Sequence, residues 1–332
     1  MLSLVDLTTD SVGHDEFATP HGRRDTECNV DDDGCYNRFP LGCSRGNKQM
    51  PEVMPVKLHR ISKQMDLAFS PTKEMRLSGI NLVAATYVFS NDLPPSEILV
   101  DVGPFHIDRK AAFTLVPKEK LVDDVLDVVV TMLSHTSPSY LWFLPTTIMQ
   151  AALEMRSLST GTLATIKAKH MPSKVDEVHR IYVPMWTVGH WYLMIIDNVR
   201  RKLIYLDSLV NPEETEDRQT AMTKVALYLE SITLGQAWLS SNDGVRPRFS
   251  TYDIEDADVP QQDRGSMDCG VWVSQWMIRG ALWKDYDVRT VNVATRMRLA
   301  IDLVLKEHNE NAKALVAKAM SHWRWKSMGA TL

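Results

Sequence analysis

Residues 260–273 read PQQDRGSMDCGVWV, a turn-rich loop that delivers one cysteine, Cys269, to the start of an apolar segment. Gly265 favours a turn, and Asp268 is a residue type preferred at the N-cap of a helix. Apolar residues then recur at helical spacing as far as Gly280. We therefore expect Cys269 at a helix N-terminus, where backbone N–H groups and the helix dipole favour the nucleophilic thiolate. Taken alone, such a cysteine is more often a buried structural residue.

Length and composition indicate an ordinary globular chain. Its 332 residues, 44% hydrophobic and 24% charged, suffice for one large domain and a smaller part. A net charge of -5 argues against nucleic-acid binding, and no apolar run approaches the roughly 18 residues that a membrane span needs. The first residues also lack the layout of a secretion signal. We expect a monomer of the nucleus or cytoplasm that binds neither nucleic acid nor membrane.

The first 50 residues mix Asp, Gly, Asn, Arg and Pro without sustained apolar periodicity, and we expect little order there. Cys28, Cys35 and Cys43 lie in this tract at intervals of seven and eight residues. Zinc sites usually pair ligands two to four residues apart, and cysteines of an intracellular protein normally stay reduced. The sequence thus predicts no metal site, no disulfide framework and no cofactor.

A buried hairpin precedes the cysteine loop. Apolar segments at residues 181–186, 188–197 and 202–207 predict strands, and their lack of strict alternation predicts a sheet covered by helices on both faces. His190 starts one strand and Asp207 ends its antiparallel neighbour, so the two residues should lie side by side at one edge of the sheet.

This placement suits nucleophilic catalysis. An imidazole can take the proton of a thiol while a carboxylate on its other nitrogen fixes tautomer and orientation. Gln261 and Gln262, just upstream of the cysteine, could donate an amide to an oxyanion. A lone His beside a strand, or a lone terminal Asp, is more often structural. Together, however, His190, Asp207 and Cys269 predict a thiol-based catalytic triad.

The same residues carry a family resemblance. Gly189–Trp191, Leu206–Ser208, Gln262 and Asp268–Val273 resemble motifs of the ubiquitin-like-protein-specific cysteine proteases, the SUMO (sentrin) protease family. The resemblance covers roughly residues 118–310, and its closing helix is similar to that of plant, often transposon-associated, members. It implies an α+β, papain-like cysteine protease fold with a central, mostly antiparallel sheet flanked by helices. We assign residues 116–325 to this catalytic domain and residues 51–115 to a small N-terminal extension.

The resemblance also implies an activity. The chain would be a thiol protease or isopeptidase that cleaves after the C-terminal glycine of a SUMO-like modifier, maturing its precursor or releasing it from lysine. His190, Asp207 and Cys269 would form the triad. The alternative is a catalytically weak or inactive relative that only binds modifiers and derives from a mobile element.

Two departures from the family pattern bear on these alternatives. The family places its oxyanion glutamine six residues before the cysteine, whereas Gln262 stands seven before Cys269. We assign the oxyanion role to Gln262 because the intervening turn can absorb one residue. Lys120 stands where the family has a tryptophan that covers the groove for the modifier's Gly-Gly tail, and Trp142 or Trp186 could replace it. We assign substrate binding to Trp191 and Trp142.

Two further helices follow from periodicity. One begins after a cap at Asn211 and a first-turn proline, Pro212. The other extends over residues 291–316. We expect its solvent side to carry a set of charged residues: Arg296, Arg298, Lys306 and Glu307.

Overall fold

A computed structural model describes residues 65–77, 79–281 and 289–328. The expectation of little order in residues 1–50, and the three cysteines there, lie outside the described residues. The described helices are α1 (Gly79–Val88), α2 (Arg109–Ala112), α3 (Asp123–Thr136), α4 (Thr146–Leu153), α5 (Thr160–His170), α6 (Pro212–Ile232), α7 (Cys269–Ala281), α8 (Val293–Leu305) and α9 (Ala312–Met328). The described strands are β1 (Ile98–Asp101), β2 (His106–Asp108), β3 (Leu141–Phe143), β4 (Arg180–Thr187), β5 (His190–Asp197), β6 (Lys202–Leu206) and β7 (Asp253–Asp256).

The main sheet has the strand order β3-β4-β5-β6-β7. Its central pairs, β4 with β5 and β5 with β6, are antiparallel, as expected from the short turns that join them. The outer pairs, β3 with β4 and β6 with β7, are parallel. The α+β, papain-like class predicted from the sequence is confirmed, with a sheet that is antiparallel in the centre and parallel at both edges.

The turn between β4 and β5 sets the register of the catalytic edge. Thr187 lies opposite His190, so only Val188 and Gly189 connect the strands. Both have positive φ, 50° and 79°, as a type I′ turn requires. The turn therefore fixes His190 as the first residue of β5, at the end of the sheet where β6 stops one residue before Asp207.

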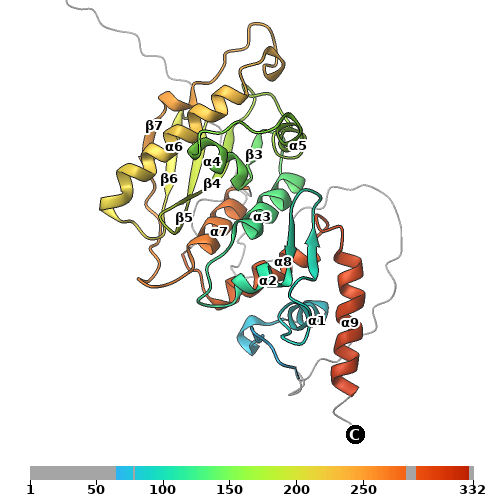
Figure 1. The fold of residues 1–332 in the computed structure, drawn as a ribbon. Helices are drawn as coiled ribbons and strands as arrows, with labels where there is room; N and C mark the ends of the chain where they lie inside the picture. The colour runs from blue at the N-terminus through green and yellow to red at the C-terminus, as the bar shows by residue number, and fades with distance from the viewer. Residues whose placement is uncertain (1–64, 78, 282–288, 329–332) are drawn as a thin grey trace, which may run out of the picture. The chain divides into compact units, whose positions relative to one another are not determined.

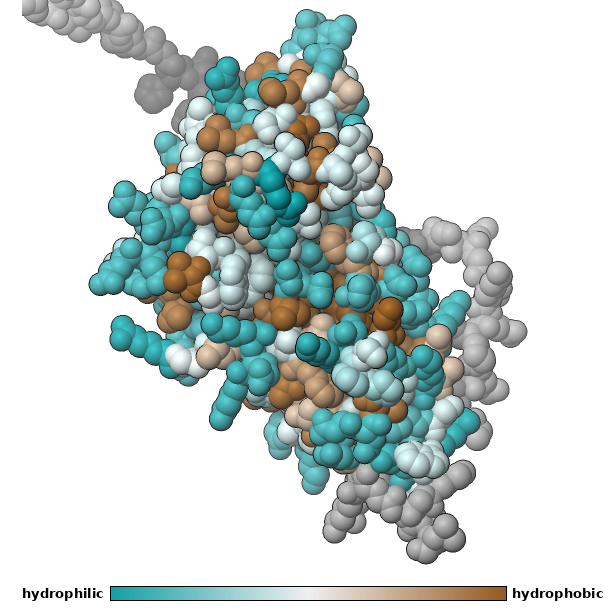
Figure 2. All heavy atoms as spheres, in the orientation of Figure 1, coloured by the Kyte–Doolittle hydropathy of each residue, from teal (hydrophilic) through white to brown (hydrophobic). Residues whose placement is uncertain are grey.

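Helices cover the sheet. α6 runs in front of the strands in Figure 1 and packs on α4, which contacts β4. α7 packs against β5 and α3. The helical spacing expected after Cys269 is confirmed, because Val273, Trp276 and Met277 of α7 are completely buried. On the face shown in Figure 2, hydrophobic side chains form small groups among hydrophilic ones, as is usual for a protein surface.

The segment before residue 116 packs on the last helices of the chain. The helix expected over residues 291–316 is interrupted: α8 ends at Leu305 and α9 begins at Ala312. α1 contacts both helices. Asn309, just after α8, donates to Leu99 O at 3.0 Å and accepts from Asp101 N at 3.0 Å. Residues 65–115 therefore share a core with α8 and α9. In the described part of the chain, no helix has the length and apolar character needed to cross a bilayer.

Candidate active site

Cys269 is the first residue of α7 and is only 2% exposed. Burial raises the pKa of its thiol, but the hydrogen bond with His190 and the donating backbone N–H groups of Trp191 and Gly270 outweigh this effect and lower the pKa below its usual value. The helix start therefore favours the thiolate, as the sequence predicted. The carboxylate of Asp268, expected as an N-cap, is instead held by Ser266 and Arg296.

His190 joins the cysteine to the aspartate. Its Nε2 lies 2.7 Å from Oδ1 of Asp207, which leaves Nδ1 for the hydrogen bond with the Cys269 thiol. Burial lowers the pKa of His190, but the hydrogen bonds with Asp207 and Cys269 raise it to a net value of about 9. With the thiol pKa lowered and the imidazole pKa raised, the pair favours the thiolate–imidazolium form near neutral pH.

Asp207 lies directly after β6, and its side chain is fully buried. Besides His190, its carboxylate accepts from the backbone N–H of Leu209 at 2.9 Å and from the Tyr205 hydroxyl, and it pairs with Arg218. Burial raises the pKa of Asp207, yet the hydrogen bonds from His190 and Tyr205 bring it below its ordinary value. The aspartate is therefore held as a carboxylate, and it has a second charged partner that the sequence did not reveal.

The two glutamines of the loop have different partners. Both amide hydrogens of Gln261 are used, by Asp207 O at 2.8 Å and Val259 O at 3.2 Å. The Oε1 of Gln262 accepts from Ser208 Oγ at 2.9 Å, and its Nε2 donates to Ser266 O at 3.0 Å. Since a primary amide has two N–H donors, the buried Gln262 retains one for a substrate oxygen and Gln261 does not. This difference supports the choice of Gln262.

Gly270 permits close packing beside the nucleophile. A Cβ on this glycine would lie 2.8 Å from Leu121 Cβ and 3.2 Å from Trp191 Cδ1. The indole of Trp191 donates to Leu121 O at 2.9 Å and is 4% exposed, so most of it is engaged inside the protein. Trp191 thus contacts the site through its backbone N–H, and its binding of substrate stays a prediction.

The substrate-binding role assigned to Trp142 is wrong. This residue lies in β3, is completely buried, and donates from Nε1 to Ser173 Oγ at 3.0 Å. The other two residues of β3 are also apolar and buried, so the indole of Trp142 is part of the hydrophobic core. Trp186, named as the other substitute, is partly buried with its ring 4.7 Å from that of Trp191. Lys120 is exposed and donates to Gly189 O at 2.9 Å.

Arg296 was expected to face solvent, and this expectation is wrong: the residue is 1% exposed. From α8, its guanidinium donates to Asp268 Oδ1 at 2.7 Å and to Met267 O at 2.7 Å. It also donates to three backbone carbonyls of the segment before α3, those of Thr114, Val116 and Glu119. One side chain therefore connects the residues before Cys269 to α8 and to that segment.

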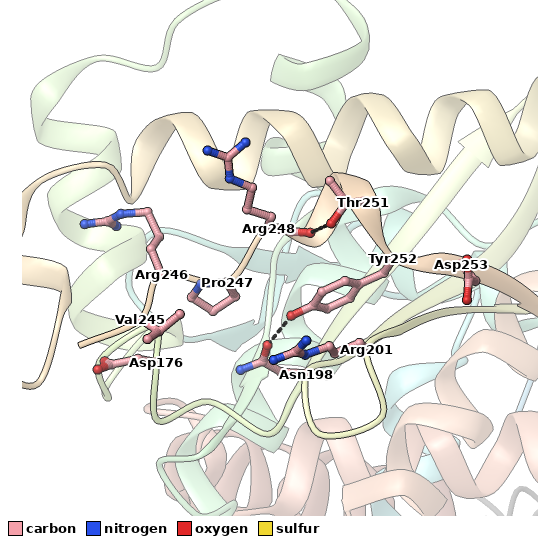
Figure 3. Close-up of a pocket in the computed structure, with 10 residues that line it drawn as sticks. All are labelled: Asp176, Asn198, Arg201, Val245, Arg246, Pro247, Arg248, Thr251, Tyr252 and Asp253. Atoms are coloured by element: carbon pink, nitrogen blue, oxygen red, sulfur yellow. Dashed lines mark hydrogen bonds between the residues drawn. The ribbon is translucent and has the colours of Figure 1, made fainter. Parts of the chain in front are cut away.

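A cavity of about 530 Å³ lies at the other end of the sheet (Figure 3). It is bordered by Asn198, which follows β5, and by Asp253, which begins β7. At about 3.4 Å per residue, Asn198 is roughly 27 Å along the strand from His190. In Figure 3, Arg246 and Arg248 of its lining point away from Tyr252. The guanidinium of Arg246 donates hydrogen bonds to the backbone carbonyls of Thr233 and Gly235. This cavity is separate from the triad.

The comparisons with known proteins agree with this geometry. Residues 154–312 match the family model of the Ulp1 protease family, C-terminal catalytic domain. No curated protein matches the chain. The C-terminal Ulp1 protease domain solved in complex with Smt3, the yeast ortholog of SUMO, is 18% identical with a TM-score of 0.52, covering 72% of this chain and 97% of that one. A SUMO protease Ulp1 with its catalytic cysteine oxidised to a sulfenic acid is 20% identical with a TM-score of 0.53, covering 75% and 99%.

The fold and the family match define a cysteine-type peptidase domain. Residues 154–312 match the Ulp1 protease family, so the resemblance drawn from the sequence is confirmed.

Proposed function

We propose that this protein is a thiol protease and isopeptidase that cleaves after the C-terminal glycine of a SUMO-like modifier, in the nucleus or cytoplasm. The observation that carries the proposal is the hydrogen-bonded chain from Cys269 through His190 to Asp207 at the start of α7. The similar Ulp1 domain solved with Smt3 supports the choice of modifier class.

The reaction steps follow from the ionisation of Cys269 and His190 as a thiolate and an imidazolium. The Cys269 thiolate adds to the carbonyl carbon of the terminal glycine, and the free N–H of Gln262 stabilises the oxygen that becomes negative. When the C–N bond breaks, the His190 imidazolium gives its proton to the leaving amine, which is a lysine side chain or the next residue of a precursor. A thioester remains on Cys269. His190, now neutral, takes a proton from water as the oxygen of that water adds to the thioester carbonyl. The C–S bond then breaks, and Cys269 leaves as the thiolate beside the His190 imidazolium. The modifier is released as a carboxylic acid that loses its proton to solvent.

Asp207 keeps the imidazole in the orientation that these steps need. Its Oδ1 binds Nε2, so Nδ1 faces the sulfur throughout the cycle. Because Asp207 is held ionised, it also stabilises the imidazolium form.

The test is the hydrolysis of two substrates: a SUMO precursor with residues beyond the terminal glycine, and SUMO linked to a lysine peptide. We expect the wild-type protein to release both products and Cys269→Ser to release neither. The triple variant Cys28, Cys35 and Cys43→Ser is the matched control and should remain active. Tight binding of SUMO without release of either product would contradict the proposal and favour the modifier-binding alternative.

A further inference from the structure

Arg218 of α6 contacts the aspartate of the triad from the side opposite to the histidine. Its Nη1 pairs with Oδ2 of Asp207, whereas Oδ1 of the same carboxylate lies 2.7 Å from Nε2 of His190. The side chains of Arg218 and Asp207 are 3% and 0% exposed. The two carboxylate oxygens therefore serve different partners, one being the imidazole and the other a buried guanidinium.

A buried carboxylate needs a partner that keeps its charge stable. Tyr205 and Leu209 supply neutral donors to Asp207, and His190 carries a charge only in its protonated form. A guanidinium stays charged at every working pH. Among the described residues, Arg218 is the permanently charged group in contact with Asp207.

Arg218 is itself held in place. Its Nη2 pairs with Glu214 one helical turn earlier, and its guanidinium carbon lies 5.8 Å from the centre of the Tyr192 ring. The Tyr192 hydroxyl donates to the backbone oxygen of Arg218 at 3.3 Å. These contacts join α6 to β5, the strand that begins with His190, so the guanidinium has little freedom to leave the carboxylate.

We propose that Arg218 is a positioning residue for hydrolysis: by binding Oδ2, it keeps the Asp207 carboxylate ionised and turned so that Oδ1 faces His190. This inference rests on the proposed function, since it assigns Arg218 to the same triad. The competing explanation is a structural link between α6 and β6 that has no effect on the imidazole. The two explanations differ in whether the effect of Arg218 depends on the charge of Asp207.

The test measures the ionisation of Cys269 without any modifier. In a background with Cys28, Cys35 and Cys43 changed to Ser, only Cys269 remains to react with iodoacetamide. Alkylation rates are measured from pH 5 to 10 for Arg218→Met, Arg218→Lys and the parent. We expect Arg218→Met to react about tenfold more slowly at pH 6, within the range for coupled neighbours, with its midpoint moved to higher pH. Arg218→Lys should recover most of the rate because it keeps the charge.

Glu214→Gln is the matched control. It alters the contact of the second guanidinium nitrogen, Nη2, without changing Asp207, and it should leave the alkylation midpoint in place. Circular dichroism checks that each variant is folded at the assay temperature. If Arg218→Met is not folded, Arg218→Gln takes its place in the series.

A double-variant cycle decides between positioning and structure. If Arg218 acts through the aspartate, adding Arg218→Met to Asp207→Asn should cause no further loss of alkylation rate. The inference is overturned if folded Arg218→Met keeps the parental rate and midpoint, or if its loss adds in full to that of Asp207→Asn. Hydrolysis of the SUMO substrates is measured on the same proteins. Absence of hydrolysis in the parent would contradict the proposed function alone, because alkylation does not depend on it.

Discussion

Two ion pairs at opposite ends of the main sheet differ in burial and in the number of their partners. At the end that carries His190, the charged side chains of Asp207 and Arg218 are buried and each has several partners. At the other end, Arg200 pairs with Glu255 at 2.7 Å, and the two side chains are 51% and 36% exposed. Buried charges cost several kcal/mol when they lose a partner, whereas exposed pairs contribute about 0–1 kcal/mol. The comparison indicates that the Asp207–Arg218 pair is part of the candidate site, whereas the Arg200–Glu255 pair is an ordinary surface contact.

The largest expected effect is that of Cys269→Ser on turnover. A serine hydroxyl has a far higher pKa than a thiol, so His190 cannot ionise it usefully. Hydrolysis of SUMO conjugates should fall to background while the affinity for the modifier, measured by calorimetry, is retained. Turnover near that of the parent would show that another group is the nucleophile.

Gln262→Ala should have the next largest effect. The oxyanion donor acts mainly in the transition state, so its loss should lower kcat by about 10²–10³-fold, or about 2.7–4 kcal/mol, with little change in KM. Gln261→Ala is the control because both of its amide hydrogens are occupied, and its effect on kcat should be mild. A larger loss for Gln261→Ala would place the donor one residue earlier in the loop.

Arg296→Met should lower stability strongly. The change removes the cationic partner of Asp268 and the donor of four partly buried hydrogen bonds to backbone carbonyls, and we expect a loss of about 3 kcal/mol in the free energy of unfolding. Arg298→Met, two residues along α8 with a 57% exposed side chain, is the matched control. Urea unfolding of both variants measures the difference. Equal stability of the two would mean that the buried network contributes no more than a surface pair.

The pH dependence of turnover tests the same network. The pKa of His190 is raised to about 9, so the imidazolium that protonates the leaving amine is present below pH 9 and is lost as the pH rises through that value. Above this pH, we expect kcat/KM to fall about tenfold per pH unit. Asp207→Asn removes the charge that raises the histidine pKa, so the fall in kcat/KM of this variant should begin at a lower pH. If the fall begins at the same pH in that variant, Asp207 does not affect the ionisation of His190.

The smallest effect is expected at the other end of the sheet. Arg200→Ala breaks an exposed ion pair and should change the free energy of unfolding by no more than about 0.5 kcal/mol and leave kcat unchanged. Urea unfolding and a single hydrolysis assay are sufficient. A loss as large as that of Arg296→Met would remove the contrast between buried and exposed ion pairs.

The sequence predicted the triad because each member lies at the end of a regular element. A strand start, a strand end and a helix start can be located from apolar runs and turn residues, and the antiparallel hairpin brings the first two together. Local patterns do not specify partners that approach from another element. Arg218 and Arg296 were therefore missed, and Arg296 was placed on the wrong side of its helix.

The sequence contains a weak indication that both arginines are buried. Arg218 is three, four and seven residues before Ala221, Met222 and Val225, which line the buried face of α6. Arg296 likewise precedes Ala300 and Leu303 on the buried side of α8. A cation in register with an apolar stripe indicates a buried charge that needs a partner. The sequence does not reveal which partner, since that depends on how the helices pack.

The prediction for Trp142 was wrong for a different reason: it assigned a function to a residue that is structural. An aromatic residue in a short apolar run was assigned to substrate because the family's tryptophan is replaced by Lys120. The structure places this indole in the core, where its N–H is satisfied by Ser173. Large aromatic residues are more often buried than functional, and a strand of three buried residues allows no other placement.

The most direct measurement of the central claim is the covalent capture of Cys269 by a SUMO molecule whose C-terminal glycine ends in a vinyl sulfone. A poised thiolate adds to this group without hydrolysis, and digestion followed by mass spectrometry identifies the modified residue. The account predicts one adduct, on Cys269, that is absent in Cys269→Ser and slower in Asp207→Asn. An adduct on Cys28, Cys35 or Cys43, or no adduct while iodoacetamide still alkylates Cys269, would contradict it.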